Sequence, residues 1–159
     1  MATSLFNRSV QWEWEGDRGV WQQYPLDIQQ EISKAFEKGD KEVAINQTEE
    51  ITMIIKFPTM TQINQKTKFL RRIRLCIEFS DRNGFYVFEY QNEQQKWLVY
   101  NVEIMLEIAK AIDNDEDLIS IDSNNQSYEI DLKKSIETKS NRKIHRIKSS
   151  LYLRKIFDL

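Results

Sequence analysis

Residues 10–14 read Val-Gln-Trp-Glu-Trp, and 76 residues later the chain reads Tyr86-Val-Phe-Glu-Tyr90. The same shift superposes apolar or aromatic residues at further positions: Trp21 on Trp97, Tyr24 on Tyr100, Ile28 on Ile104, Ile32 on Ile108, Ala35 on Ala111 and Ile45 on Ile121. After one residue of the first repeat is skipped, so that the spacing becomes 75, the correspondence continues with Phe57 on Leu132, Gln62 on Glu137 and Arg71 on Arg146. Self-similarity at one spacing predicts a single fold used twice.

Each repeat is predicted to begin with a β-hairpin. In the first repeat, Val10, Trp12 and Trp14 alternate with polar neighbours, which is typical of a half-buried strand. Residues 16–19, Gly-Asp-Arg-Gly, are a turn signal that leads to a second aromatic strand through Trp21 and on to Tyr24.

A helix is predicted to follow each hairpin. In the first repeat, Asp27 is the expected N-cap and Gly39 the expected left-handed residue after the last turn. In the second repeat, Asn101 is the expected N-cap. The apolar positions with helical spacing are Ile28, Ile32, Ala35 and Phe36, and Ile104, Ile108, Ala111 and Ile112.

Runs of β-branched and apolar residues come after each helix and predict further strands. They span residues 43–45, 51–57 and 63–77 in the first repeat, and 118–121, 128–132 and 144–147 in the second. We therefore expect an α+β fold in which one helix lies on a curved antiparallel sheet, twice.

The chain length of 159 residues divides accordingly into two small domains. We expect a first domain over residues 8–78 and a second, more divergent one over 84–150, joined by a short segment with the turn signal Asn83-Gly84. Units of about seventy residues are small for independent folding, so the two are expected to support each other. The tail, residues 151–159, is too apolar to be left in water, and packing across the two units is favoured over docking a partner.

Charge and composition exclude several classes of protein. Lys and Arg number 23 against 25 Asp and Glu, so the net charge of −2 gives no overall field that favours nucleic acid or anionic lipid. Hydrophobic residues make up 40% of the chain, but no apolar run is long enough to span a membrane. We expect no membrane association and no general nucleic-acid binding.

The chain has one cysteine, Cys76, and one histidine, His145. These counts exclude an internal disulfide and a Cys/His zinc site. The sequence also shows neither a nucleophile paired with a general base nor a pair of catalytic carboxylates. We expect Cys76 to be a buried small hydrophobe, and we expect no enzyme activity, no cofactor and no metal. The N-terminus lacks the pattern of a secretory signal, which predicts a cytoplasmic or nuclear location.

Two segments at equivalent places in the repeat carry only positive charges. Residues 66–74 contain five basic residues and no acid, and residues 139–148 contain five more. Alternation along a strand places about half of each set on one face, which predicts an anion-binding stripe. The alternative is a solvated edge strand that positive charge protects against sheet-to-sheet association. The acid-rich segment 113–117, Asp-Asn-Asp-Glu-Asp, is expected to form a solvated loop.

Several stretches of the first repeat together resemble a WWE domain. They are Val10-Gln-Trp12-Glu-Trp14, Trp21-Gln-Gln-Tyr24, Ala35-Phe36-Glu-Lys-Gly39, Ile55-Lys-Phe57, Met60-Thr-Gln62-Ile-Asn64-Gln-Lys-Thr67 and Arg71-Arg72-Ile73-Arg74. The second repeat is similar but matches the family pattern less closely. Phe88-Glu-Tyr90 replaces the Trp-Glu-Trp pattern, Glu137 stands at the position of Gln62, and Lys139 stands at that of Asn64. The tandem resembles the N-terminal region of deltex-type ubiquitin ligases.

This resemblance implies a half-barrel of strands around one helix, and binding of ADP-ribose units of poly(ADP-ribose). By the family pattern, Tyr24 supplies an aromatic ring and a hydroxyl at the mouth of the pocket. Gln62 supplies an amide that can both donate and accept hydrogen bonds, and Arg71 supplies the guanidinium that binds the phosphates. Arg72 and then Arg74 are the alternatives if the register slips. Met53 stands where a second tyrosine is expected; its thioether can lie flat on a base but offers no hydroxyl.

The second repeat keeps the rings Tyr100 and Tyr128 and the arginine Arg146, but Glu137 replaces the amide. An ionised carboxylate repels the two phosphates of the ligand. We therefore expect the first repeat to hold the functional binding site and the second repeat to be mainly structural. The tryptophans Trp12, Trp14, Trp21 and Trp97 are expected to be structural as well.

Two functions remain open from the sequence. The first is a non-catalytic module that recognises ADP-ribose, poly(ADP-ribose)-modified protein or a related adenine nucleotide, in ubiquitin or ADP-ribosylation signalling. The second, which the degenerate positions Met53 and Glu137 favour, is a deltex-like protein–protein interaction module. It would bind a partner such as ankyrin repeats through the groove between the two units or through the apolar tail.

Overall fold

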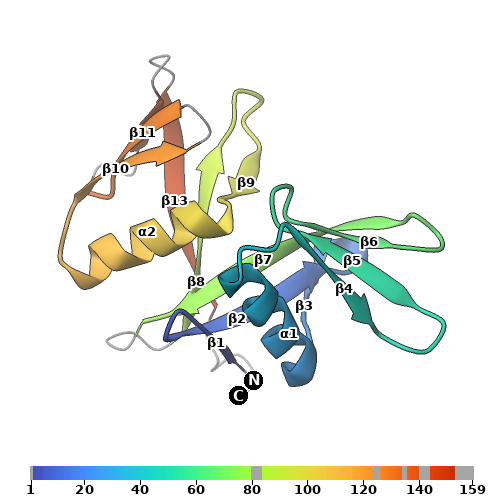
Figure 1. Ribbon diagram of the computed structural model, residues 1–159. Helices are drawn as coiled ribbons and strands as arrows, with labels where there is room; N and C mark the ends of the chain where they lie inside the picture. The colour runs from blue at the N-terminus through green and yellow to red at the C-terminus, as the bar shows by residue number, and fades with distance from the viewer. Residues whose placement is uncertain (1, 80–83, 124–125, 134–135, 140–143, 153–159) are drawn as a thin grey trace, which may run out of the picture. The chain divides into compact units, whose positions relative to one another are not determined.

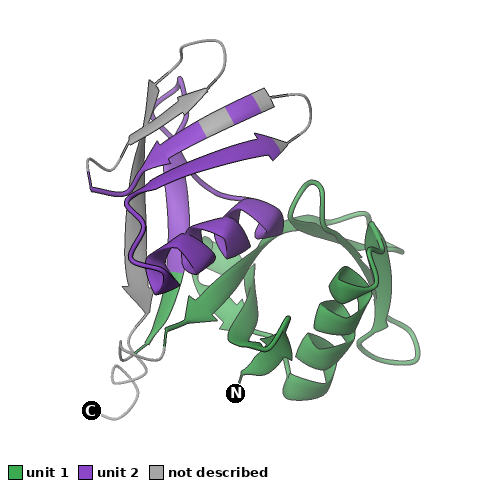
Figure 2. Cartoon of the chain, turned by 60° about the vertical axis from the view of Figure 1, so that its left-hand side comes forward, with its two compact units in different colours: residues 1–86, 152–159 green, residues 87–151 purple. Residues whose placement is uncertain are grey.

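The computed structural model describes residues 2–79, 84–123, 126–133, 136–139 and 144–152. The chain divides into two compact units (Figure 2): unit 1 holds the described residues up to Tyr86 together with Tyr152, and unit 2 spans residues 87–151. The predicted turn at Asn83 and most of the predicted apolar tail lie outside the described residues. The predicted domain limits, 8–78 and 84–150, stay predictions.

Unit 1 contains one helix and an antiparallel sheet (Figure 1). Its elements are β1 (Thr3–Leu5), β2 (Arg8–Glu15), a 3-10 turn (Asp17–Gly19), β3 (Trp21–Gln23), α1 (Leu26–Glu37), β4 (Glu42–Asn46), β5 (Thr52–Lys56), β6 (Thr61–Asn64) and β7 (Leu70–Glu78). The strands pair in the order β4-β5-β6-β7-β2, and β1 and β3 pair with β2. This curled sheet with its helix confirms the predicted α+β fold class.

The strands of unit 1 depart from the sequence-based expectations in two places. β1 was not predicted, because it turns into β2 through Phe6 and Asn7 with φ of 47° and 62°, and phenylalanine is no turn signal. The single run predicted over residues 63–77 is two strands, β6 and β7. Asn64 ends the first of them, since its side chain accepts hydrogen bonds of 3.0 Å from the backbone N–H groups of Lys66 and Thr67.

Strand β2 is attached to α1 through hydrogen bonds as well as apolar packing. Trp12 is fully buried, and its indole Nε1 donates to the hydroxyl of Ser33 over 2.9 Å. The backbone N–H of Trp12 donates to Gln29 Oε1 at 3.1 Å, and Gln29 Nε2 donates to the carbonyl of Tyr24 at 2.8 Å. Gln29 is fully buried, so one amide side chain joins β2, the helix and the residue after β3.

The N-terminal caps of the two helices differ. The predicted cap at Asp27 is wrong: Pro25 occupies the N-cap position of α1, and Asp27 lies in the first turn, where a carboxylate faces the positive end of the helix dipole. The predicted cap at Asn101 is confirmed, because its side chain accepts a 3.0 Å hydrogen bond from the backbone of Ile104.

Unit 2 repeats the order of helices and strands that unit 1 shows from β2 onward (Figure 1). Its elements are β8 (Phe85–Gln91), whose first two residues pair with β7 inside unit 1, β9 (Trp97–Val99), α2 (Val102–Asp113), β10 (Leu118–Ser123), β11 (Gln126–Asp131), β12 (Ile136–Lys139) and β13 (Ile144–Tyr152). Both helices have 12 residues, and their first residues, Leu26 and Val102, are 76 positions apart, as the repeat predicts.

The two helices end in the same motif with different residues at its left-handed position. After α1, the N–H groups of Gly39 and Asp40 donate to the carbonyls of Phe36 and Ala35. After α2, Asp115 and the residue that follows it make the equivalent two bonds. Gly39 has φ of +84°, which confirms the prediction, and Asp115 at the same place in the repeat has φ of +54°.

This difference predicts opposite effects of two substitutions. Gly39→Ala is expected to destabilise the protein by about 1 kcal/mol, because a Cβ is disfavoured at positive φ. Apart from the glycine itself and its two chain neighbours, no heavy atom of the described residues lies within 4 Å of the added Cβ, so space is not limiting. Asp115→Gly is expected to stabilise by up to about 1 kcal/mol. Urea denaturation measures both, with Lys38→Ala at φ of −72° as the control; equal effects of the two alanine variants would contradict the expectation.

Candidate ligand-binding site

The first two predicted site residues, Tyr24 and Gln62, are in direct contact. Tyr24 follows β3 and is 7% exposed, and Gln62 in β6 is 5% exposed. The hydroxyl of Tyr24 donates a hydrogen bond to Gln62 Oε1. Burial raises the pKa of Tyr24, so its hydroxyl stays protonated and available as a donor at every physiological pH.

Arg71 lies directly across from Gln62 in the β6–β7 pairing. Opposite residues of an antiparallel pair place their side chains on the same face of the sheet. On the other side of β6, Gln62 pairs with Ile55, which is fully buried and marks this as the core face. The structure therefore brings Tyr24, Gln62 and Arg71 together on one face of unit 1.

The guanidinium of Arg71 is held from several sides. It lies over the rings of Trp14 and Phe69, 5.4 and 4.8 Å from their centroids. Its Nη1 donates to the backbone carbonyl of Glu15 at 3.1 Å, and its Nη2 donates to Asp17 Oδ1 at 3.0 Å. The Arg71 side chain is 24% exposed, so part of the group still reaches solvent.

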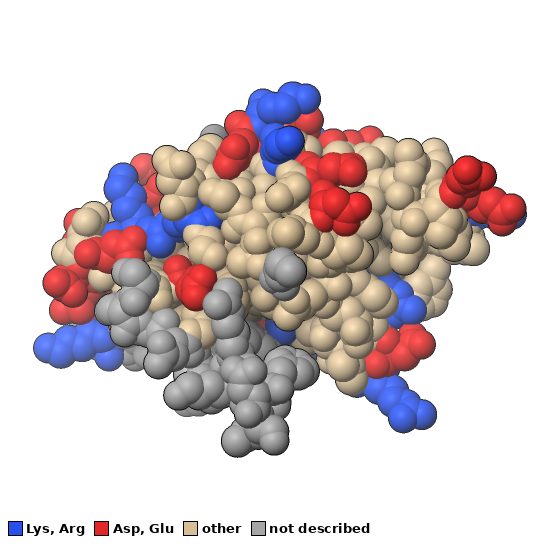
Figure 3. Space-filling model, turned by 90° about the horizontal axis from the view of Figure 1, so that it is seen from below, with Lys and Arg blue, Asp and Glu red and all other residues tan. Residues whose placement is uncertain are grey.

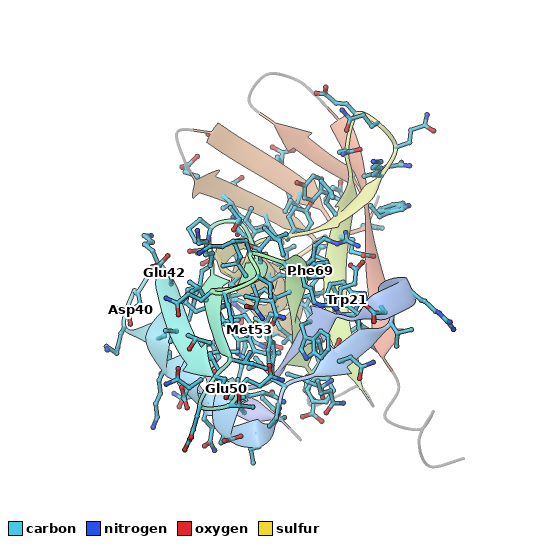
Figure 4. All side chains as sticks on the ribbon, turned by 90° about the vertical axis from the view of Figure 1, so that its right-hand side faces the viewer. Trp21, Asp40, Glu42, Glu50, Met53 and Phe69 are labelled. Carbon is cyan, nitrogen blue, oxygen red and sulfur yellow. The ribbon has the colours of Figure 1, made fainter. Side chains whose placement is uncertain are left out.

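Met53 lies on this core face, beside the row that contains Gln62. It stands two residues before Ile55 in β5, and its cross-strand partners are Ile45 and Asn64. Its side chain is half-buried, and Figure 4 shows it near the middle of unit 1. An apolar, polarisable thioether thus lies on the same face of unit 1 as the amide of Gln62.

Arg72 is not in a position to replace Arg71. It pairs with Thr61 and lies on the opposite face of β7, because successive residues of a strand point to opposite sides. There Arg72 forms an ion pair with Glu15 and lies 5.9 Å from the centroid of Trp21. The strand register therefore places Arg72, the alternative to Arg71 considered from the sequence, on the face away from Gln62.

Acidic side chains neutralise the predicted basic stripe of the first repeat. Its three arginines pair with carboxylates of β2 and of the turn after it: Arg74 with Glu13, Arg72 with Glu15 and Arg71 with Asp17. Figure 3 likewise shows acidic and basic groups interspersed on one face of the molecule. Three of the five basic charges of the predicted stripe are therefore balanced by acidic partners, which come from β2 and the turn after it and were not visible in the local sequence.

Sequence reasoning also missed a buried polar network on the outer face of β2 and β7. The Arg74 and Glu13 side chains are only 2% and 7% exposed, with 2.7 Å between Nη2 and Oε1. Gln11 donates to Glu13 Oε2 at 2.7 Å, and the Cys76 thiol donates to Oε1 at 3.3 Å. Burial raises the pKa of Cys76, which keeps the thiol protonated. Cys76 is buried as predicted, but as part of a polar network.

The four tryptophans do not share one environment. Trp12 is fully buried in the core, as expected. Trp14, Trp21 and Trp97 are half-buried. Trp14 and Trp21 lie on opposite faces of the sheet, because Trp14 pairs with Gln22 and Glu15 pairs with Trp21. Trp14 contacts the guanidinium of Arg71, so it belongs to the surroundings of the candidate site.

Unit 2 reproduces part of this arrangement. Tyr100 is 2% exposed, and its N–H donates to the carbonyl of Phe88 at 3.2 Å, as that of Tyr24 does to Trp12 at the same distance. Tyr128 pairs with Ile121 and Lys139, the places that Ile45 and Asn64 take beside Met53. The side chains of Tyr128, Glu137 and Arg146 lie outside what the structure describes.

The register of unit 2 differs from that of unit 1 at the last strand pair. Glu137 is opposite His145, and Arg146 is opposite Ile136. In unit 1, the corresponding Gln62 is opposite Arg71 itself. The strand pairing of unit 2 is therefore one residue out of step with that of unit 1, and the sequence correspondence of Arg71 with Arg146 does not extend to this pairing.

Each unit thus sets one helix against a curled antiparallel sheet, and unit 1 gathers an aromatic hydroxyl, an amide and a guanidinium on one face. The sequence matches the WWE domain family over residues 10–75 and again over residues 86–148, and the chain belongs to that family. The WWE domain is a non-catalytic module for protein–protein or poly(ADP-ribose) binding.

Curated relatives place the chain beside ubiquitin ligases of the deltex type. It is 36% identical over 72 residues to E3 ubiquitin-protein ligase DTX4 of Mus musculus, an alignment that covers 45% of this chain and 12% of the ligase. It is 34% identical over 78 residues to E3 ubiquitin-protein ligase DTX1 of Homo sapiens, covering 49% of this chain and 12% of that protein. The chain therefore spans a small part of these relatives.

Neither helix in the described part of the chain has the length and apolar content needed to cross a membrane. Within the same residues, no three His, Cys, Asp or Glu side chains are grouped so that they could hold a metal ion.

Proposed function

We propose that unit 1 binds an ADP-ribose unit of poly(ADP-ribose), or a related adenine nucleotide, and acts in ubiquitin or ADP-ribosylation signalling in the cytoplasm or nucleus. The observation that carries this proposal is the buried Tyr24–Gln62 contact directly opposite Arg71. A site for such a ligand needs a flat apolar or aromatic surface against its base and an amide that both donates and accepts hydrogen bonds. It also needs a guanidinium that can donate to two phosphate oxygens at once.

Gln62 has hydrogen-bonding capacity to spare. Its Oε1 accepts from Tyr24, and among the described residues its Nε2 has no hydrogen-bond partner. The side chain is buried, and a buried donor without a partner costs about 1–3 kcal/mol. A ligand acceptor at this point would remove that cost, which favours a polar group of a base or ribose here.

Arg71 supports binding of the phosphates. Trp14 and Phe69 hold its guanidinium in place, and a planar fork matches two phosphate oxygens at once. Met53 on the same face supplies an apolar surface for a base. The adenine, ribose and phosphate parts of one ligand thus each have a matching group in unit 1.

Calorimetric titration of ADP-ribose, iso-ADP-ribose and ATP tests this function. Arg71→Ala and Gln62→Ala are each expected to weaken binding by about 10- to 150-fold, the equivalent of about 1.5–3 kcal/mol. Arg72→Ala is the control, because Arg72 lies on the opposite face of β7 and its loss should change affinity less than about twofold. No heat from any ligand at millimolar concentration would refute the proposal, and binding that survives both site variants would relocate the site.

A protein partner is the second candidate function. Phe69, just before β7, and Leu70, its first residue, are 58% and 55% exposed, and WWE domains mediate protein interactions. We propose, as the resemblance to deltex ligases suggests, a partner such as ankyrin repeats. Leu70→Ser, which adds no charge beside Arg71, should then abolish capture of purified ankyrin repeats in a pull-down while leaving ADP-ribose binding unchanged; unaltered capture would exclude this surface.

A further inference from the structure

Asp17 makes the most exposed of the contacts that hold Arg71. It lies in the turn between β2 and β3, and its side chain is 89% exposed. Its Oδ1 accepts from Arg71 Nη2 at 3.0 Å. A guanidinium nitrogen that could donate to a phosphate oxygen therefore donates to a carboxylate instead.

The other contacts of Arg71 do not depend on Asp17. The rings of Trp14 and Phe69 lie 5.4 and 4.8 Å from the guanidinium carbon, and the carbonyl of Glu15 accepts from Nη1 at 3.1 Å. These groups come from β2 and from the residue just before β7. They keep the guanidinium in place when Nη2 exchanges one anion for another.

We propose that Asp17 is a competing carboxylate that an incoming phosphate must displace from Arg71, and that it thereby lowers the affinity of the site and selects for ligands with strongly anionic phosphates. This inference rests on the proposed function of unit 1. An ion pair with so exposed a partner is weak and readily exchanged, whereas phosphate oxygens engage a guanidinium two at a time. The displaced Asp17 remains close to the phosphates and repels them.

Removing the charge of Asp17 should therefore tighten binding. For Asp17→Asn we expect the Kd of ADP-ribose, and that of inorganic pyrophosphate, to fall by about two- to fivefold at low ionic strength. The gain should shrink as salt is added, because screening weakens the repulsion. Asp17→Glu restores a carboxylate and is expected to bind about as the wild-type protein does.

Asp40→Asn is the matched control. Asp40 also belongs to an exposed ion pair of unit 1, with Lys38 at 3.6 Å, so this variant removes one negative charge without touching Arg71. Its Kd should change by less than about 1.5-fold. The sign of the effect separates competition from a structural role, since loss of a merely structural contact would weaken binding or leave it unchanged.

The two probes separate this inference from the proposed function. If the wild-type protein binds ADP-ribose and Asp17→Asn behaves like Asp40→Asn, or binds more weakly, the competition by Asp17 is refuted while the function stands. If ADP-ribose gives no heat with any variant but pyrophosphate binds more tightly to Asp17→Asn, the function is refuted and the competition stands. If neither probe binds any variant, both are refuted.

Discussion

Replacing Arg74 with methionine is expected to lower the free energy of unfolding by about 3–5 kcal/mol. Arg74 is 2% exposed, and its Nε and Nη2 both lie 2.7 Å from Oε1 of Glu13. Without the guanidinium, the Glu13 carboxylate would stay buried, and its remaining side-chain donors among the described residues would be the amide of Gln11 and the thiol of Cys76. An uncompensated buried charge is among the most destabilising changes that one substitution can cause.

Two comparisons make the Arg74 experiment specific. The double variant Glu13→Gln with Arg74→Met should recover most of the lost stability, because it removes the charge and retains an acceptor for Gln11. Arg72→Met is the matched control: its ion pair with Glu15 is 53% exposed on the arginine side, and its loss should cost less than about 1 kcal/mol. Equal losses in urea denaturation for the two single variants would show that burial of the Glu13–Arg74 pair has no energetic consequence.

Trp12→Ala is expected to destabilise the protein by about 3–5 kcal/mol. The ring is fully buried, its centroid lies 5.9 Å from that of Phe57, and its indole N–H donates to Ser33. Alanine would leave a cavity between β2 and α1 and a hydroxyl of Ser33 without its donor. Thermal unfolding followed by circular dichroism measures the loss.

Further substitutions separate the stability that Trp12 contributes by apolar packing from the stability contributed by its hydrogen bond to Ser33. Trp12→Phe keeps most of the apolar volume and removes the hydrogen bond, so it should cost clearly less than alanine. Ser33→Ala tests the hydrogen bond from the other side and should cost about 1 kcal/mol. Trp21→Ala, at a half-buried ring on the opposite face, is the control for loss of an indole. A Trp21 variant less stable than the Trp12 variant would contradict the assignment of Trp12 to the core.

The repeat and most secondary structure could be predicted because they depend on neighbours in sequence. Helical spacing of apolar residues predicted α1 and α2, and the caps at Asn101 and Gly39 involve residues within five positions of each other. The cap at Asp27 failed because Pro25, two residues earlier, already starts the helix. The β1 strand and the break between β6 and β7 were missed, although Asn64 in its turn was a usable signal.

The residues of the candidate site could be predicted from the sequence, but the groups that surround them could not. The family pattern pointed to Tyr24, Gln62 and Arg71, which the structure places together, while their role in binding stays a proposal. The partners of the arginines, Glu13 and Asp17 among them, could not be foreseen, because they lie 54 or more residues away in the chain. A basic segment read by itself therefore suggested free charge where the fold has ion pairs.

The sequence by itself determined that this chain holds two copies of one α+β unit, since apolar periodicity, turn residues and caps are encoded within each short segment. Only the tertiary structure decided which strand residues face one another. It placed Arg71 with Gln62, turned Arg72 to the other face, and set His145 rather than Arg146 opposite Glu137. The physical reason is that side chains alternate along a strand, so a shift of one residue in a long-range pairing reverses every face, and local sequence leaves that shift open.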